Sequence, residues 1–513
     1  MTRVPHVRGF ARLETTGRGA EAAGKAIRRS VPRSQHARVP SARGRPDVVT
    51  VLEASHTGRL PELAPLRWGR MAASPYAFYR GAAAVMARDL GGTPVTGVGT
   101  RLCGDAHLGN FGLFADARGR LVLDLDDFDE TVHGPWEWDL KRLATSFVLA
   151  GREAGGTEDT CRDAARQVVC AYRKTVRLLA RLPVLEAWQA LSDESLLTHA
   201  DARGLLAEIR RAADKAHRNT SSRFAAKATS GEGEARRFVE APPVLRRVPD
   251  EEAAAVAGAL TGYLRTVPHE CRLMLARHTV QDVAFRVVGT GSVGLRSYVV
   301  LLSDPVGKPL VLQVKQAAPA SWARPATAAG FPQPRWGNDA RRVVLGQRHL
   351  QVAGDPLLGW TSVPLRGPGN GGGQGTGMAW PGADRAAGTD EAGGADEAGG
   401  TGVGAGAAPG FRVPVGSRAF QVRQFRNRKG RVETARLSPP RLVEYARLTG
   451  TLLARAHARG ADARRTAGYC GKGERLDEAV ADFAVAYADR TEADHGALLK
   501  AIAGGRLAVE QEG

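Results

Sequence analysis

The sequence lacks the marks of a membrane-spanning or exported protein. Its 513 residues contain no stretch of about 20 apolar residues, the length that a helix needs to cross a bilayer. The N-terminus has no apolar core of the secretory type. The five cysteines form no CxxC pair and no Cys/His cluster with zinc spacing. Scattered thiols in odd number fit a reducing compartment, so we expect a cytoplasmic protein without disulfides or a structural metal.

Acidic residues are too few to balance the basic ones, with 53 Asp/Glu against 72 Lys/Arg and a net charge of +19. Residues 1–45 carry eleven Lys/Arg against Glu14 and Glu21 and have few apolar residues, which predicts a disordered basic arm. Weak contact of this arm with nucleic acid is conceivable. No module that combines aromatic and basic residues supports nucleic-acid binding elsewhere. The positive charge of the remaining chain suits an anionic ligand such as a nucleotide.

No repeat of 20–50 residues is visible, and the pattern changes twice along the chain. Helical periodicity dominates to about residue 280, short apolar runs separated by glycines follow, and helical periodicity then returns. A Gly/Ala/Asp-rich stretch of low complexity predicts a flexible insertion. The predicted segments are a basic arm (1–45), a large helical lobe (46–280), a β-rich small lobe (281–365), the insertion (366–410), the end of the small lobe with a hinge (411–435), and C-terminal helices of the large lobe (436–505).

The densest group of polar residues is GDAHLGN at 104–110, followed by DLDDFDE at 124–130. Each cluster follows an apolar run, so we expect two loops held by neighbouring strands. Asp and Asn five residues apart on one loop, with a further Asp on the next, can accept a proton and bind Mg²⁺ as phosphoryl transfer requires. Asp and Asn also stabilise ordinary turns, but two such clusters, each after an apolar run and separated by a short hairpin, favour chemistry.

A second group is the glycine pattern of Gly289, Gly291 and Gly294, between two predicted strands. Glycines in such a turn let backbone amides approach phosphates. Lys315 lies on the following strand, on the face of Val311 and Gln313. A lysine in an apolar strand is costly unless it is paired or faces a cleft.

Three stretches carry a resemblance to a known family: GDAHLGNFG, DLDDFDETVHGPWEWDLKRLA, and VVGTGSVGLRSYVVLL with LQVKQA. Over about residues 45 to 500 the chain closely resembles a bacterial family of unknown function (DUF 2252). That family is similar to aminoglycoside phosphotransferases and protein kinases. The resemblance implies an α+β, protein-kinase-like fold of two lobes that binds ATP, or another nucleoside triphosphate, with Mg²⁺.

The catalytic loop of those enzymes reads like HGDxHxxN, and residues 103–110 match it. The resemblance implies that Asp105 is the catalytic base and that Asn110 and Asp127 bind the metal. His107 and Asp139 would support the loop structurally.

The same resemblance places Gly289, Gly291 and Gly294 over the nucleotide phosphates and Lys315 against them as a catalytic and binding residue. Two departures from the pattern stand out: Cys103 replaces the first histidine of the loop, and Leu345 replaces the glutamate expected to pair with Lys315. Gln347 could substitute for that glutamate.

The order of these motifs is inverted, because the catalytic loop precedes the glycine loop and the helix that normally leads into the catalytic loop, ARLTGTLLARAHARG, occupies 446–460. A circular permutation accounts for the order. The favoured interpretation is an ATP- and Mg-dependent phosphotransferase with an unknown small-molecule or protein acceptor. The alternatives are a catalytically dead nucleotide-binding or scaffold protein and a nucleotidyl transferase to a protein hydroxyl. The cation-rich region 186–280 follows the catalytic core, so its Arg223, Lys227, Arg246 and Arg247 are the expected acceptor side.

Overall fold

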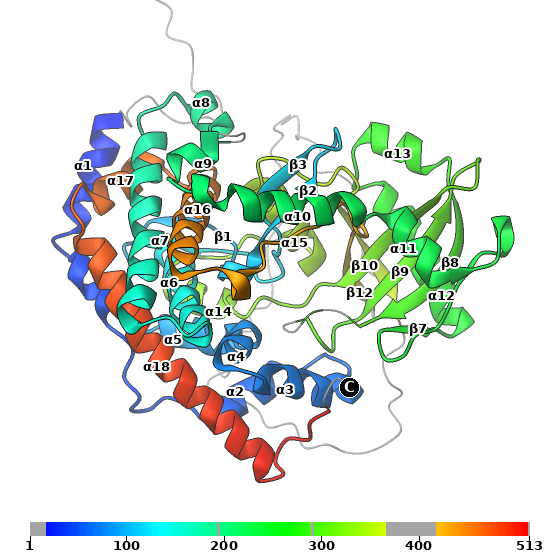
Figure 1. Cartoon of the computed structure of the whole chain (residues 1–513), viewed down its shortest axis with the longest axis horizontal. Coiled ribbons are helices and arrows are strands. Elements are labelled where there is room, and N and C mark those ends of the chain that lie inside the picture. Colours follow the sequence, from blue (N-terminus) through cyan, green and yellow to red (C-terminus); the bar gives the residue numbers. More distant parts are fainter. Residues whose placement is uncertain (1–16, 192–194, 288, 290–291, 366–416, 511–513) are drawn as a thin grey trace, which may run out of the picture.

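The computed structural model describes residues 17–191, 195–287, 289, 292–365 and 417–510. They form a mixed α+β protein with a helical part and a part built on one large sheet (Figure 1). The expected insertion at 366–410 lies outside these residues. No helix among them is long and apolar enough to cross a membrane.

The helices are α1 (Gly17–Ile27), α2 (Val48–Ala54), α3 (Ala64–Ala72), α4 (Pro75–Gly81), α5 (Ala83–Leu90), α6 (Trp136–Glu153), α7 (Glu158–Leu179), α8 (Val184–Gln189), α9 (Ser195–His199), α10 (Leu206–Arg218), α11 (Ser221–Ala228), α12 (Asp250–Leu264), α13 (His269–Leu275), α14 (Ala323–Ala328), α15 (Asp339–Leu350), α16 (Pro439–Ala458), α17 (Ala463–Cys470) and α18 (Arg475–Ala503). The strands are β1 (Gly99–Leu102), β2 (Phe111–Ala115), β3 (Leu121–Leu125), β4 (Val132–Pro135), β5 (Thr229–Ser230), β6 (Arg237–Phe238), β7 (Leu245–Arg247), β8 (Thr279–Arg286), β9 (Ser297–Ser303), β10 (Pro309–Gln316), β11 (Gly359–Pro364) and β12 (Ser417–Gln424).

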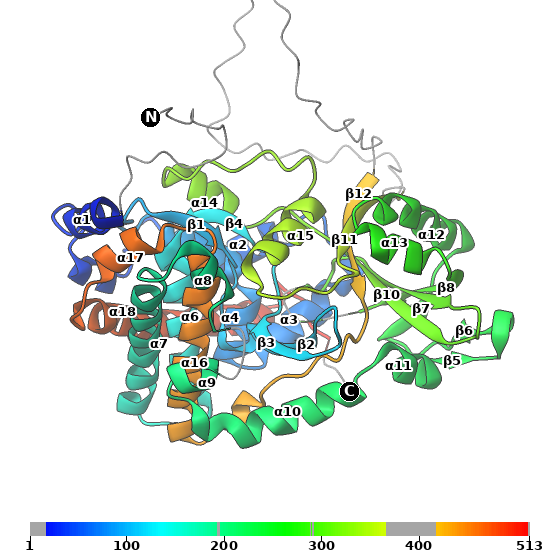
Figure 2. The same cartoon turned by 90° about the horizontal axis from the view of Figure 1, so that it is seen from above.

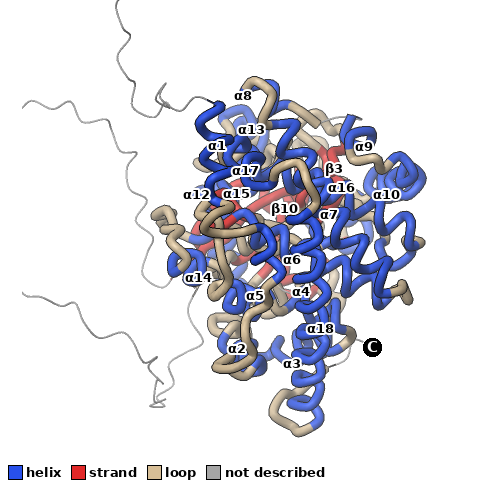
Figure 3. Tube along the Cα trace, turned by 90° about the vertical axis from the view of Figure 1, so that its left-hand side faces the viewer, coloured by secondary structure: helices blue, strands red, loops and turns tan. Residues whose placement is uncertain are grey.

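The core of the helical part is formed by α6, α7, α16 and α18, which lie together on one side of the molecule (Figures 1 and 3). The helical spacing of Leu140, Leu143, Ala144 and Phe147 predicts a buried stripe on α6, and all four are fully buried. The start of α4 also follows the sequence. Its Ser74 cap accepts a hydrogen bond from the Ala77 amide, and proline occupies the first helical position.

The prediction of a disordered arm is wrong for residues 17–45. Helix α1 packs on α17 so closely that a Cβ on Gly24 would lie 2.0 Å from the Arg465 carbonyl oxygen. Arg45 forms ion pairs with Asp89 and Asp494 at 2.8 and 2.6 Å. The basic residues of this segment therefore bind particular partners in the folded chain, and composition alone does not reveal such partners.

Two short antiparallel hairpins carry the polar loops. Strand β1 pairs with β4, and β2 pairs with β3. The runs expected at 99–103 and 121–125 are thus strands, but they belong to different hairpins.

The large sheet is antiparallel, in the order β11-β12-β10-β9-β8-β7. One face packs against α12, where Leu312 and Val314 of β10 contact Val256 and Leu260. Val311 of β10 lies on the other face, against α11. Figure 2 shows α10 running from the helical part towards α11 beside the sheet. Because side chains alternate between the two faces of a strand, Lys315 lies on the same face as Val311, which is not the face that α12 covers.

Candidate functional site

Loop 103–110 connects β1 to β2 and is held by Asp139 of α6. The two carboxylate oxygens of Asp139 accept hydrogen bonds from the backbone amides of Cys103 at 2.6 Å and Gly104 at 2.9 Å. His457, near the end of α16, places its Nε2 3.2 Å from the same carboxylate. Asp139 and His457 are each 1% exposed. The expected bracing contact between Asp139 and the loop is therefore present, and α16 contributes to it.

Gly104 shows why the loop needs a glycine at this position. Its φ of +83° is in the left-handed region, and a Cβ there would lie 2.0 Å from the Glu130 carbonyl oxygen. The catalytic-type loop and the Asp-rich loop therefore touch through backbone.

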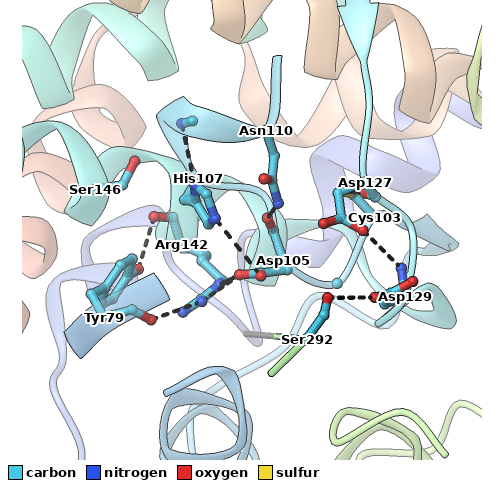
Figure 4. A network of polar contacts seen from close by, with 12 residues as sticks. Tyr79, Cys103, Asp105, His107, Asn110, Asp127, Asp129, Arg142, Ser146 and Ser292 are labelled. Atoms are coloured by element: carbon cyan, nitrogen blue, oxygen red, sulfur yellow. Dashed lines mark hydrogen bonds and ion pairs between the residues drawn. The ribbon is translucent and has the colours of Figure 1, made fainter. Parts of the chain in front are cut away.

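Asp105 projects from this loop and is held through one of its oxygens. Arg142 of α6, fully buried, donates from Nε to Asp105 Oδ1 at 2.6 Å and from Nη2 to the Tyr79 carbonyl at 3.1 Å (Figure 4). Burial raises the pKa of Asp105 above its usual value, although Arg142 opposes the rise. Oδ2 makes no hydrogen bond with any described residue, and its neighbour His107 Nε2 is 3.8 Å away. Asp105 thus keeps one oxygen available as a proton acceptor.

His107 and Asn110 shape the same loop. His107 Nδ1 accepts from the Gly109 amide at 3.1 Å, and burial lowers the pKa of His107 well below its usual value, so the neutral ring carries its proton on Nε2. Asn110 donates from Nδ2 to the Asp105 carbonyl at 2.7 Å. This bond leaves the Asn110 side-chain oxygen as a possible metal ligand.

Loop 124–130 brings Asp127 beside Asn110. The Asp126 amide donates to the Asn110 carbonyl at 3.0 Å, and the Cys103 thiol donates to the Asp127 carbonyl at 3.2 Å. Burial raises the pKa of Asp127, but Lys315 and further cations lower it by more, so its pKa lies below the usual value. Cys103 thus connects the two loops.

Lys315 reaches this loop from β10 and forms an ion pair with Asp129, two residues after Asp127. Asp129 also accepts from Ser292 Oγ at 3.2 Å and from Gln421 Nε2 at 3.1 Å. The expected substitute, Gln347 of α15, instead donates to Gln351 at 3.1 Å. Asp129 is therefore the carboxylate partner of Lys315. The sequence analysis expected that partner on α15 and did not identify Asp129.

The glycine pattern is only partly described. Gly291 lies outside the described residues. Gly289 has a φ of +70° and lines the cavity that contains Lys315. Gly294 has a φ of +89°, and a Cβ there would lie 2.9 Å from Arg59 Cβ. Gly294 is not among the cavity residues, so its small size serves close packing on the segment that contains Arg59.

One cavity of about 870 Å³ is lined by Asp105, His107, Asn110, Asp127 and Lys315. Eleven Lys/Arg residues line it against four Asp/Glu. The cations include Arg423, Lys429 and Arg431, and Arg431 pairs with Asp126 at 2.9 Å. Burial and Arg423 lower the pKa of Lys429 to about 8. The charge around the cavity suits a polyanion.

The predicted acceptor side is wrong in its location. Arg223, Lys227, Arg246 and Arg247 do not line this cavity, and Arg246 lies over the Phe285 ring, 5.0 Å from its centre. Reasoning from chain order placed them there, but residues 219–247 pack around the sheet. The wall beside Asp105 instead comes from residues 54–84.

Within the described ranges, no three His, Cys, Asp or Glu residues are grouped as a ready metal site. Mg²⁺ often binds through one or two carboxylates together with substrate phosphates. Asp127 and the Asn110 side-chain oxygen fit that smaller donor set.

The sequence was compared with known families and proteins. A family model described as an uncharacterized protein conserved in bacteria (DUF2252) matches residues 59–367 and 406–501. No curated protein and no solved structure matches. The family match covers every candidate residue discussed above.

Proposed function

We propose that this chain, which belongs to the DUF2252 family, is an ATP- and Mg-dependent phosphotransferase with a circularly permuted, protein-kinase-like two-lobe fold. The observation that carries the proposal is the convergence of Asp105, Asn110, Asp127 and Lys315 on one cavity. Lys315 and its partner Asp129 are 186 residues apart. Phosphoryl transfer depends mainly on such positioning and on electrostatics.

The permutation is supported by the end of α16. The Thr100 hydroxyl of β1 donates to the His457 carbonyl at 3.2 Å, and His457 also contacts Asp139. The C-terminal end of α16 is therefore beside the strand that leads into loop 103–110, as if the chain had been cut between them. The sheet with Lys315 would be the small lobe and the helical part the large lobe.

The proposed transfer uses the two aspartate loops in different ways. Mg²⁺ held by Asp127 and Asn110 would neutralise phosphate charge, and Lys315 would bind phosphate oxygens. Asp105 Oδ2 would accept the proton of the acceptor hydroxyl while the hydroxyl oxygen forms a bond to the γ-phosphorus. The bond from that phosphorus to the bridging oxygen breaks, and its electron pair leaves with ADP. Arg142 orients Asp105 for this step.

A catalytically dead nucleotide-binding protein is the second candidate. The ion pair between Lys315 and Asp129 supports it, because the lysine is held by the loop instead of by a glutamate on α15. Nucleotidyl transfer by the same groups would show itself in the mass of the product.

The test is a thermal-shift screen of nucleotides with and without Mg²⁺, followed by mass spectrometry of protein and small-molecule products. We expect a Mg-dependent shift with ATP that Lys315→Met removes and Lys308→Met, in an exposed turn, leaves intact. Addition of phosphate identifies phosphoryl transfer and addition of a nucleotide identifies nucleotidyl transfer. Binding without any product supports the dead protein, and no nucleotide shift at all refutes both candidates.

A further inference from the structure

The cavity has a second basic wall that the proposed nucleotide site does not use. It is formed by residues 54–84, which include Arg67 on α3 and Arg80 on α4. Small residues, among them Gly58 and Ala84, line the same wall, and a Cβ on Gly58 would meet no atom within 4 Å.

Arg67 is a buried cation without an anion. It is 1% exposed, and its Nη2 donates to Ser55 Oγ at 2.9 Å and the Gly81 carbonyl at 3.3 Å. Its Nε and Nη1 have no hydrogen-bond partner among the described residues. A buried guanidinium with unsatisfied donors is costly, and a bound anion could accept a hydrogen bond from one of these two nitrogens, which lie on opposite sides of the guanidinium.

Arg80 is the neighbour of Gly81 and lies nearer the catalytic loop. Its guanidinium lies 6.0 Å from the centre of the Tyr76 ring, and the Tyr76 hydroxyl is 3.4 Å from His107 Nδ1. Arg80 Nε is buried and has no hydrogen-bond partner in the described part of the chain. Arg67 thus donates to the carbonyl of the residue that follows Arg80, and the charge of Arg80 acts on Asp105.

Three other cations of the site, all close to the aspartate loops, have carboxylate partners. Arg142 is paired with Asp105, Lys315 with Asp129, and Arg431 with Asp126. In the described structure neither Arg67 nor Arg80 forms an ion pair.

We infer that Arg67 and Arg80 form an anion subsite that binds a carboxylate or phosphate group of the acceptor and presents the acceptor hydroxyl to Asp105. The acceptor is then an anionic alcohol. This assignment of the acceptor class rests on the proposed phosphotransferase function. Arginine suits the role because its planar donors bind both oxygens of such a group.

Inorganic phosphate is the probe that tests the subsite. The full chain is saturated with Mg²⁺ and the non-hydrolysable analogue AMP-PNP, which fills the nucleotide phosphate positions, and phosphate is titrated by thermal shift and calorimetry. We expect Arg80→Gln to weaken phosphate binding by at least about tenfold, the loss of one charge-assisted bidentate contact. Arg88→Gln, an exposed arginine on α5, should leave phosphate affinity unchanged.

Arg67→Lys is the second variant, because it keeps the buried charge and removes the planar pair of donors. It should also weaken phosphate binding while the AMP-PNP shift is retained. The subsite is refuted if phosphate does not bind, if Arg80→Gln binds it normally, or if either arginine variant loses AMP-PNP binding.

The same titration without nucleotide separates this inference from the proposed function. If the chain binds no nucleotide, the phosphotransferase proposal fails. Even then, the anion subsite predicts that the Lys315→Met variant still binds phosphate and that the Arg80→Gln variant does not. Any other combination of these two results refutes the subsite.

Discussion

Loops 103–110 and 124–130 place Asp105 and Asp127 in the lining of the same cavity, yet the two carboxylates have opposite electrostatic surroundings. Burial dominates at Asp105 and raises its pKa, whereas Lys315, with other cations, outweighs burial at Asp127 and lowers its pKa. A carboxylate with a raised pKa is the better proton acceptor, and one with a lowered pKa remains ionised as a metal ligand. The comparison teaches that two aspartates 22 positions apart obtain different roles from their neighbours.

The largest expected effect comes from removing the metal side of this comparison. Asp127→Ala should abolish the Mg-dependent part of nucleotide stabilisation. Even the mutation of a residue that only orients a metal ligand lowers metal affinity by about 10- to 100-fold. Thermal shift across a Mg²⁺ titration measures the change, with Asp159→Ala on the surface of α7 as the control. An unchanged Mg²⁺ dependence would remove Asp127 from the metal site.

Asp105→Asn should leave the nucleotide shift close to that of the wild type and slow transfer by about 10²- to 10⁴-fold, the usual contribution of a general base. The amide keeps the shape of the carboxylate but cannot accept the proton. ADP release in single-turnover experiments gives the rate. Turnover at the wild-type level would show that Asp105 is not the base.

Asp139→Ala tests the support of loop 103–110. It leaves the buried Cys103 and Gly104 amides and His457 without their acceptor, so we expect a loss of about 3 kcal/mol in the free energy of unfolding. Urea unfolding measures the loss. Asp139→Asn retains one acceptor oxygen and should cost less; equal stability of Asp139→Ala and the wild type would contradict the bracing role.

The smallest expected effect is a difference between the pH dependence of transfer, which depends on Asp105, and that of Mg-dependent nucleotide binding, which depends on Asp127. Transfer should fall in acid at a pH above the ordinary aspartate pKa of about 3.9, as Asp105 becomes protonated, while Mg-dependent nucleotide binding persists below that pH. The two aspartates also change the free energy of unfolding with pH in opposite directions. Asp127 stabilises the fold above its ordinary pKa and loses this effect as the pH falls through its lower folded pKa, whereas the fold loses stability as the pH rises through the raised pKa of Asp105.

Profiles of kcat/KM and of nucleotide affinity against pH test this division. Coincident acid limbs in the two profiles would mean that one group controls both binding and transfer.

Much of the local structure could be predicted from the sequence. The stripe on α6, the cap of α4 and the strands with a two-residue period depend on nearby residues, which a linear pattern records. The helical periodicity before residue 280 does not show by itself where one helix ends and the next begins, as between α8, α9 and α10. Residues 17–45 are ordered by contacts with α17 and α18, and such distant partners leave no periodic signal.

The candidate site divides in the same way. The sequence by itself determined the two polar loops, the lysine on β10 and the loop glycine Gly104, because each depends on residue type and short spacing. Only the tertiary structure decided that Asp129 pairs with Lys315, that Arg142 clamps Asp105, and that Arg67 and Arg80 face the cavity in place of Arg246 and Arg247. The physical reason is that the energy of a charge depends on burial and on neighbours within a few ångströms, and the fold brings those neighbours from distant parts of the chain.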